Sequence, residues 1–417
     1  MPGTHPSRRL LLAHAIVLLG VAVALGGCTA DSVSIVGPTA EPTYSVTGDG
    51  ILKLGTLFDS THSLAEAQVA GVELAVRDIN DAGGVLGVPV EVRHRNSGKS
   101  DGSRIDEALT ELTDAATDAI IGPASSSLAE RVTPAVVAAG VPLISPSADS
   151  IALTTLDDDG FIARTVPSYA LQGSAFAAAF ATASITTVSV LVSDDAAGTA
   201  LEADLGSTLE AGDTELLASA KVSEPDAVAT VTAGSPGAIV VATDGATPAE
   251  NAATLSALVD AGAKPGELWL ASDTVFDYSD ELPGGTLEGA HGLLPGAVPT
   301  KEFRARLRLA DPYLSEYRFA AEAYDATVLV ALSAMAAGDD GGHAIARELS
   351  AVSAGGIRCS SFAECVHVLD AGEEIDYAGI SGAVDLDANG DVSGGTYSQI
   401  LYGDDGNFAD DRIIRVD

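Results

Sequence analysis

Two serine-rich segments of the chain have the composition of anion-binding turns. Gly122-Pro123-Ala124-Ser125-Ser126-Ser127 follows a short apolar run and opens a segment with helical periodicity, and Ser145-Pro146-Ser147-Ala148-Asp149 repeats this arrangement one unit later. Free backbone N–H groups and a hydroxyl at a helix start can hold a carboxylate. Isolated Ser and Asp residues at such places are usually only helix N-caps. Two segments at the ends of neighbouring strands favour a shared site that includes Ser126, Ser147 and Asp149.

The elements that would position these turns alternate along the chain. Residues 51–58 read as a strand, and apolar residues between 64 and 79 fall on one face of a helix. Alternating valines over 88–92 predict the next strand. Further strand-like runs, each followed by a helix-like stretch, lie at 119–121, 141–145, 188–192, 238–242 and 267–270. This order predicts α/β architecture with parallel sheets, and roughly ten such units require two lobes.

Composition excludes several classes of protein. The 417 residues include 21 Lys+Arg against 59 Asp+Glu, giving a net charge of -38, and 47% are hydrophobic. The apolar fraction is too high for a disordered chain. The negative charge repels phosphate backbones and anionic lipid head groups, so we expect no nucleic-acid partner. No apolar run beyond residue 27 reaches the length of a membrane-spanning helix.

The N-terminus reads as an export signal. Arg8-Arg9 precedes an apolar stretch over 10–25, and Gly26-Gly27-Cys28 follows it. This ending resembles a bacterial lipobox, which implies cleavage before Cys28 and a lipid on that cysteine. We therefore predict a signal peptide at 1–27, a flexible tether at 28–49 and attachment to the outer face of the cell membrane. A buried or spanning helix is the less favoured alternative.

Two cysteines are left for the folded part. Cys359 and Cys365 are expected to form a disulfide, because an extracytoplasmic location permits one. A metal site that adds His367 is the alternative, but no fourth ligand is evident and the spacing matches no standard zinc pattern. Cofactor motifs are incomplete as well: Gly98-Lys99-Ser100 lacks the leading glycine of a phosphate-binding loop. We expect no cofactor and no metal.

Several segments together resemble a known family, the type I periplasmic binding proteins of the branched-chain amino acid and amide ABC-transporter group. The matching segments are 51–57, 71–84, 121–123, 141–146, 164–167, 324–326 and 380–386. The resemblance covers nearly everything from residue 50 onward. It implies a fold of two Rossmann-like lobes joined by a three-strand hinge. Lobe 1 is then expected at 50–168 plus 297–391, and lobe 2 at 169–296 plus 392–417.

The resemblance also implies a binding site between the lobes. The family holds a ligand carboxylate with a serine and backbone amides, which correspond here to Ser126, Ser147 and Asp149. An acid of the second lobe pairs with the ligand ammonium, and Asp273 falls there, although an N-cap is an equal alternative for it. Other pocket positions depart from the family, since Asp149 replaces Thr and the usual tyrosines and acid are absent. These other positions are Leu64, Tyr169, Ala197 and Thr247, the last in a pocket-edge loop over 244–247.

These features predict an extracytoplasmic substrate-binding lipoprotein of an ABC importer. It would capture a small amino-acid-like ligand, amide or carboxylate as a monomer, deliver it to the membrane permease and catalyse nothing. The departures favour a ligand that is larger or more cationic than leucine, isoleucine or valine. A ligand-sensing receptor lipoprotein of the same fold is the alternative. A secreted hydrolase using Ser126 and His62 is the least favoured hypothesis, because only those two residues suggest it.

Overall fold

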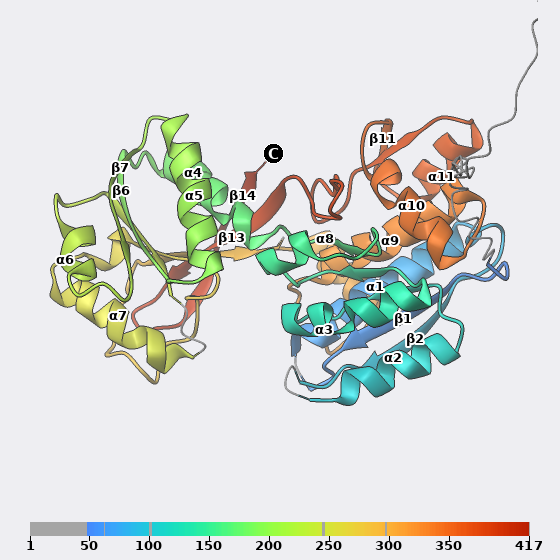
Figure 1. Ribbon diagram of the computed structural model, residues 1–417, viewed down its shortest axis with the longest axis horizontal. Coiled ribbons are helices and arrows are strands. Elements are labelled where there is room, and N and C mark those ends of the chain that lie inside the picture. Colours follow the sequence, from blue (N-terminus) through green and yellow to red (C-terminus); the bar gives the residue numbers. More distant parts are fainter. Residues whose placement is uncertain (1–47, 62, 100–101, 244–246, 297, 417) are drawn as a thin grey trace, which may run out of the picture. The chain divides into compact units, whose positions relative to one another are not determined.

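Two sheets, each with helices on both faces, carry the fold in this computed structural model (Figure 1). The structure describes residues 48–61, 63–99, 102–243, 247–296 and 298–416. The predicted signal peptide, Cys28 and nearly all of the tether lie outside the described residues, as does His62. The predicted alternation of strands and helices holds over most of residues 53–270. It breaks after them, where three helices follow one another and the last two described strands form a hairpin.

The first sheet has five parallel strands in the order β2-β1-β3-β4-β5. Its strands are β1 (Lys53–Phe58), β2 (Glu91–Asn96), β3 (Ala119–Ile121), β4 (Leu143–Ser145) and β5 (Ile162–Arg164). The expected strand over 88–92 begins only at Glu91, because Val88 forms an isolated bridge with Val85 in the preceding turn. Strand β2 is the sheet edge and is mostly polar, whereas β3, β4 and β5 are buried throughout.

Helices α2 (Arg104–Asp114) and α3 (Ser126–Ala139) cover one face of this sheet, and α1 (Ser63–Asp81) and α9 (Ala320–Ala337) cover the other (Figure 1). Adjacent residues along a strand serve opposite faces. Ile120 packs into the α2 and α3 side, and its neighbour Ile121 packs into the α1 and α9 side. Burial on both faces explains why these strands read as continuous apolar runs instead of alternating ones.

Helix α9 is the central helix of this part of the molecule. Among the described residues it alone is long and apolar enough to span a membrane, yet 83% of it is buried. It packs against α1 and α10. Around it lie α8 (Lys301–Ala310), α10 (Gly342–Ser353), α11 (Phe362–Asp370) and the parallel pair β11 (Ile357–Cys359) and β12 (Ile375–Tyr377). Its apolar length therefore reflects a protein core.

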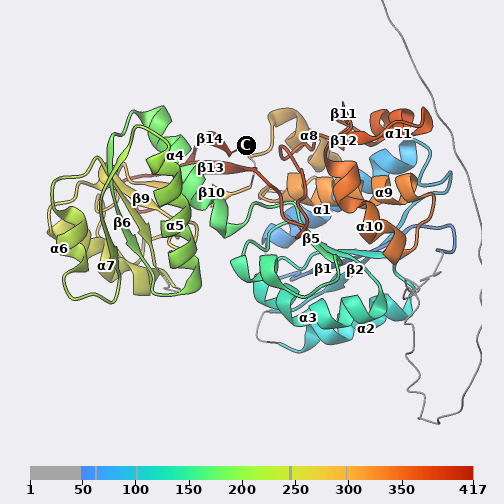
Figure 2. The same ribbon diagram turned by 45° about the horizontal axis from the view of Figure 1, so that its top comes forward.

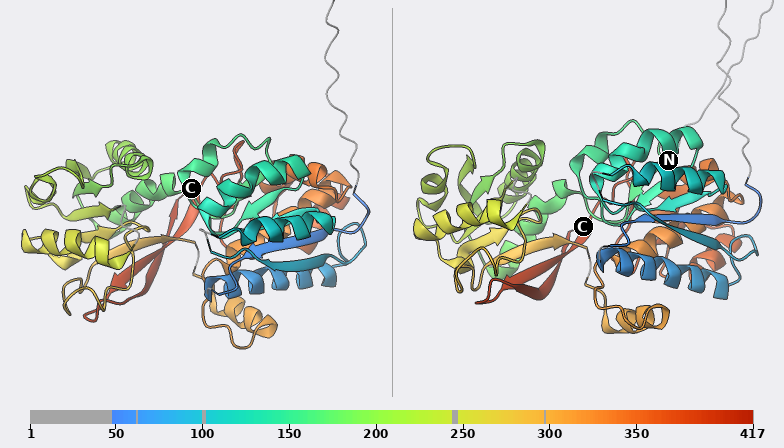
Figure 3. Two further views of the ribbon diagram at one scale, coloured as in Figure 1. Left: turned by 60° about the horizontal axis from the view of Figure 1, so that its bottom comes forward. Right: turned by 90° about the horizontal axis from the view of Figure 1, so that it is seen from below.

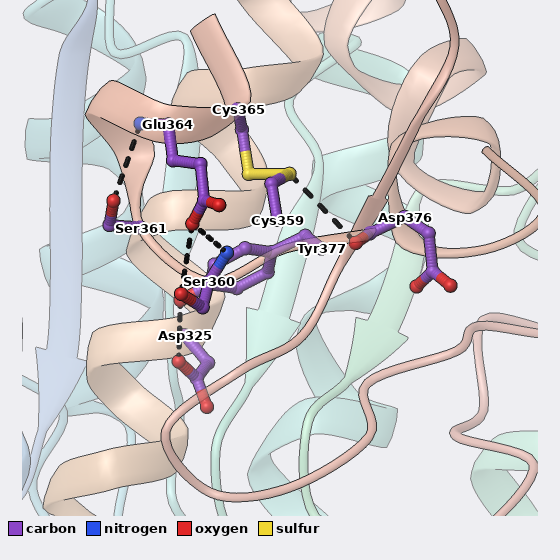
Figure 4. Close-up of a disulfide and its surroundings, with 8 residues drawn as sticks. All are labelled: Asp325, Cys359, Ser360, Ser361, Glu364, Cys365, Asp376 and Tyr377. Atoms are coloured by element: carbon purple, nitrogen blue, oxygen red, sulfur yellow. Dashed lines mark hydrogen bonds between the residues drawn. A yellow bond between two sulfur atoms is a disulfide. The ribbon is translucent and has the colours of Figure 1, made fainter. Parts of the chain in front are cut away.

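A disulfide joins Cys359 at the end of β11 to Cys365 in α11 (Figure 4). Both residues are buried, with exposed fractions of 1% and 0%. Bonded sulfurs offer no thiolate, so in this form they are not ligands for a metal. Nearby, the buried Asp325 carboxylate accepts hydrogen bonds from the Tyr377 hydroxyl at 2.8 Å and from the Ser381 amide at 2.8 Å. The carboxylate thus ties the loop after β12 to α9.

The second sheet has seven strands in the order β14-β13-β10-β9-β8-β6-β7. The parallel strands are β6 (Thr187–Val192), β7 (Glu215–Lys221), β8 (Ala238–Ala242), β9 (Leu268–Leu270) and β10 (His291–Pro295). The hairpin of β13 (Gly395–Tyr402) and β14 (Phe408–Val416), red in Figure 3, adds to β10 in antiparallel orientation. Strands β13 and β14 therefore complete a sheet whose other strands all lie between residues 187 and 295 of the chain.

Helices cover both faces of this sheet too (Figure 2). Helices α4 (Gln172–Ala183) and α5 (Ala196–Glu210) pack on one face, and α6 (Ala227–Thr232) and α7 (Pro248–Asp260) pack on the other. Three short 3-10 helices complete the described structure: η1 (Ile151–Thr155), η2 (Tyr169–Leu171) and η3 (Pro265–Glu267). The chain passes between the elements of the two sheets three times, after β5, after β10 and before β13.

Candidate ligand-binding site

The two serine-rich turns contact each other directly. Ser126 begins α3, and its Oγ accepts a hydrogen bond from the Ser150 amide at 3.1 Å. Ser147 Oγ donates to the Ala124 carbonyl at 3.2 Å and accepts from Gln68 Nε2 at 3.0 Å. Both hydroxyls thus already hold one turn against the other. Their predicted role in binding a carboxylate stays a prediction.

A buried arginine fixes the loop that carries Asp149. The Arg164 guanidinium, 1% exposed, donates to the Ser150 carbonyl at 2.8 Å. It also donates to both carboxylate oxygens of Asp391, at 2.6 and 2.8 Å. Burial raises the pKa of the Asp149 carboxyl, and the positive charge of Arg164 opposes that shift. The sequence placed Asp391 only in a turn, so this partnership was missed.

Asp273 and Tyr169 form the polar centre of the site. Asp273 follows β9, and its Oδ2 accepts a hydrogen bond from the Tyr169 hydroxyl at 2.7 Å. Thr274 Oγ1 donates to Oδ1 at 3.1 Å. Burial raises the pKa of Asp273 to about 7, against the lowering effect of these two hydrogen bonds, and the negative charges of Asp149 and Asp195 add to the rise. A cation that binds beside such a carboxyl stabilises its charged form.

A cavity of about 320 Å³ opens at this centre. It lies where β9 and β10, parallel neighbours, both end. It is lined by Asp149, Tyr169, Ser272, Asp273, Leu294, Pro295, Arg318 and Phe319. Three predicted residues, Asp149, Tyr169 and Asp273, therefore come together. The other five were missed: Leu294 and Pro295 close a strand-like run that could have indicated them, whereas nothing in the local sequence singles out Arg318.

The remaining predicted residues lie elsewhere. Leu64 lines a different cavity, of about 420 Å³, together with Ser125 and Lys99. Ala197 lies in the first turn of α5 and packs beside the α4 and α5 core. Thr247 is the N-cap of α7, accepting from the Glu250 amide at 3.4 Å, and the rest of its predicted loop, 244–246, is outside the described residues. Ligand contacts by these three residues stay predictions.

A comparison with known families bears on the fold. Residues 68–401 match the family described as the receptor family ligand binding region. The chain belongs to this family. The family recognised from scattered sequence segments is confirmed, and so is the fold class, a type I periplasmic binding protein with parallel-sheet lobes; the lipoprotein form stays a prediction.

Proteins similar to this chain differ in what their names report. The chemotactic signal transduction system substrate-binding protein BasB of Halobacterium salinarum is 30% identical over 354 residues, 79% of this chain and 80% of that protein. The branched-chain amino acid binding protein LivJ of Streptococcus pneumoniae, solved with isoleucine, has a TM-score of 0.58 at 19% identity, covering 88% of this chain and 99% of its own. A solute-binding protein of Rhodopseudomonas palustris, solved with benzoate, has a TM-score of 0.56 at 19% identity, covering 88% and 98%.

Proposed function

We propose that this protein is the substrate-binding component of an ABC importer and captures a small amino-acid-like ligand without changing it chemically. The observation that carries the proposal is the part-buried Asp273 carboxyl, which accepts a hydrogen bond from Tyr169 and lines a cavity at the strand ends of a binding-protein fold. A buried carboxyl whose pKa is raised is stabilised in its charged form by a nearby cation. The ammonium group of an amino acid supplies such a cation.

The proposal includes the arrangement expected from the sequence. The lobes are 50–168 plus 297–391 and 169–296 plus 392–417. The ligand site draws on Asp149, Tyr169 and Asp273, and the predicted residues Ser126 and Ser147 hold its loops together. Ligand contacts to both lobes would shift the population toward a closed form that the permease recognises. A monomer anchored outside the membrane through a lipid on Cys28 completes this arrangement.

A second candidate function is ligand sensing. The observation that favours it is the name of BasB, which assigns that 30% identical relative to chemotactic signal transduction. In this alternative the closed form docks on a membrane signal transducer instead of a permease. Deleting the gene would separate the two functions: loss of ligand uptake supports transport, and loss of directed swimming with normal uptake supports sensing.

The binding function itself is tested by thermal unfolding of the secreted chain carrying Cys28→Ser. The probes are the twenty L-amino acids, simple amides, benzoate and 4-hydroxybenzoate. A probe at a hundred times its dissociation constant adds about 2.7 kcal/mol to the free energy of unfolding. We expect a stabilising amino acid, and we expect Asp273→Asn to remove most of its effect. Asp280→Asn, an exposed acid in the same loop region, is the matched control. Absence of stabilisation by every amino acid would reject an amino-acid-like ligand.

A further inference from the structure

Arg318 brings a positive charge to a cavity otherwise lined by acids and uncharged residues. Among the described lining residues it is the sole cation, and Asp149 and Asp273 are the anions. No hydrogen bond or ion pair of its guanidinium is found within the described part of the chain, and Asp273 is occupied by Tyr169 and Thr274 instead. The cavity is therefore lined by both a cation and acids, and no ion pair joins them in the described part of the chain.

The backbone beside Arg318 is held in place by its neighbours. Glu316 Oε1 accepts hydrogen bonds from the Tyr317 amide at 2.8 Å and from the Arg318 amide at 2.9 Å. The Tyr317 hydroxyl donates to the Leu314 carbonyl at 2.9 Å, and the Arg304 guanidinium lies 5.1 Å from the Tyr317 ring centroid. These contacts of Glu316 and Tyr317 fix the backbone at Arg318, and none of them involves the Arg318 side chain.

The next residue makes that corner sharp. Phe319 has φ of 62°, in the left-handed region that bulky residues rarely adopt, and it leads directly into α9. Gly296 lies against it, because a Cβ at Gly296 would stand 3.0 Å from the Phe319 ring. Backbone outliers of this kind persist where the surrounding structure enforces them, and they gather at ligand sites.

Arg318 also lies at a place that the following helix makes unfavourable for a cation. It lies just before the N-terminus of α9, where the positive end of the helix dipole disfavours a cation. A carboxylate ligand would offset this, because guanidinium binds carboxylate through two parallel hydrogen bonds.

We propose that Arg318 binds the carboxylate of the ligand while Asp273 pairs with its ammonium, which makes zwitterionic amino acids the substrate class. This inference rests on the proposed binding function and refines it. The serines expected to hold the carboxylate are engaged in contacts between their loops, and neither Ser126 nor Ser147 lines this cavity. In this proposal Arg318 binds the carboxylate in their place. A ligand that satisfies both Arg318 and Asp273 must carry a carboxylate and an ammonium on one small molecule.

The test measures dissociation constants by calorimetry for the tightest-binding L-amino acid and for the amine left when its carboxylate is removed. The wild-type chain should bind the amino acid at least about tenfold more tightly than the amine. Arg318→Gln should weaken amino-acid binding about 10- to 100-fold and leave amine binding nearly unchanged, with Arg318→Lys intermediate. Arg347→Gln, which removes one exposed positive charge on α10, is the control and should change neither.

The outcomes separate this inference from the proposed function. Amino-acid binding that is unchanged in Arg318→Gln but lost in Asp273→Asn overturns the role of Arg318 and leaves the binding function standing. If no amino acid binds the wild type, the zwitterion class is rejected, and benzoate becomes the probe. Benzoate binding that is lost in Arg318→Gln keeps Arg318 as the carboxylate anchor, whereas unchanged or absent benzoate binding overturns it. Unfolding temperatures without probe confirm that each variant is folded, and Arg318→Lys serves if the glutamine variant is not.

Discussion

Asp273 is under two opposing influences in the same small space. Hydrogen bonds from Tyr169 and Thr274 favour its charged form, while burial and the charges of Asp149 and Asp195 favour the neutral one. The balance leaves its pKa at about 7. A group poised in this way is neutral or charged according to pH, so its ability to attract an ammonium depends on pH as well.

Affinity for an amino-acid ligand should therefore rise with pH and level off above about 7. Below that pH, Asp273 is protonated and loses its attraction for ammonium, so the affinity should fall by up to about tenfold per pH unit. Calorimetric titrations between pH 5.5 and 8.5 measure this dependence, which Asp273→Asn should remove. An affinity that is equally high at pH 5.5 and 8 would contradict the prediction.

The same shift has the opposite sign for stability. Because folding raises the pKa of Asp273 from 3.8 to about 7, its contribution is most favourable below pH 4 and declines as pH rises through 7. We expect Asp273→Asn to flatten part of the decline in unfolding free energy between pH 4 and 7, measured by urea unfolding without probe. Only part is expected, since burial raises the pKa of Asp118 to about 7 too. An unchanged slope in the variant would contradict this assignment.

At the scale of elements, the site depends on loops tied together across the sequence. Two strand-to-helix turns are joined through Ser126 and Ser147, and Arg164 at the end of β5 secures the loop around Asp149 to Asp391. The second turn leads into the 3-10 helix η1 instead of the expected longer helix. A few buried polar contacts fix the conformation of these loops. Loss of one contact is therefore expected to weaken the remaining ones.

Removing one partner of the Arg164 and Asp391 pair should be costly. Arg164→Met leaves the buried Asp391 carboxylate without its cation and the Ser150 carbonyl without its donor, and we expect a loss of about 3–5 kcal/mol in the free energy of unfolding. The double variant Arg164→Met with Asp391→Leu should lose less than the sum of the two single variants. Urea unfolding measures all three. Additive losses would show that the pair is not coupled.

The disulfide is an element-scale feature separate from the site. It closes a short loop, since Cys359 and Cys365 are separated by 6 positions. Replacing both cysteines by serine should lower the free energy of unfolding by about 2 kcal/mol, because the unfolded chain gains freedom. Ligand affinity should stay the same, as neither residue lines the cavity. As a control, adding a reductant to the double variant should not change its free energy of unfolding. Weaker ligand binding by the double variant would show that the disulfide loop and the ligand site are not independent.

For the whole molecule, the dominant physical property is its charge of -38. Excess negative charge repels itself in the folded state and lowers stability. Screening shortens the range of that repulsion from about 10 Å at 0.1 M salt to about 3 Å at 1 M. We therefore expect the unfolding temperature to rise steadily with NaCl over this interval, and KCl should act equally. A flat or falling unfolding temperature would show that repulsion among the acids is not limiting.

The sequence by itself determined the architecture and the family. Regular periodicity, turn residues and short apolar runs reflect local hydrogen bonding and burial, so they can be read directly. They predicted four of the five strands of the first sheet and three of the seven strands of the second. Three of the cavity residues were also predicted: Asp149 from a strand end that topology brings to this edge, and Tyr169 and Asp273 from the family resemblance.

Only the tertiary structure decided how these residues are used. Tyr169 and Asp273 are 104 positions apart, and Arg164 and Asp391 are 227 apart, so no local pattern encodes either pair. A serine that caps a helix, joins two loops or binds a ligand has the same local sequence, which is why Ser126 and Ser147 could not be assigned from spacing. Arg318 reaches the cavity through a corner that Glu316 and Phe319 define. Long-range packing, which fixes burial and charge around each group, supplied what the sequence pattern could not.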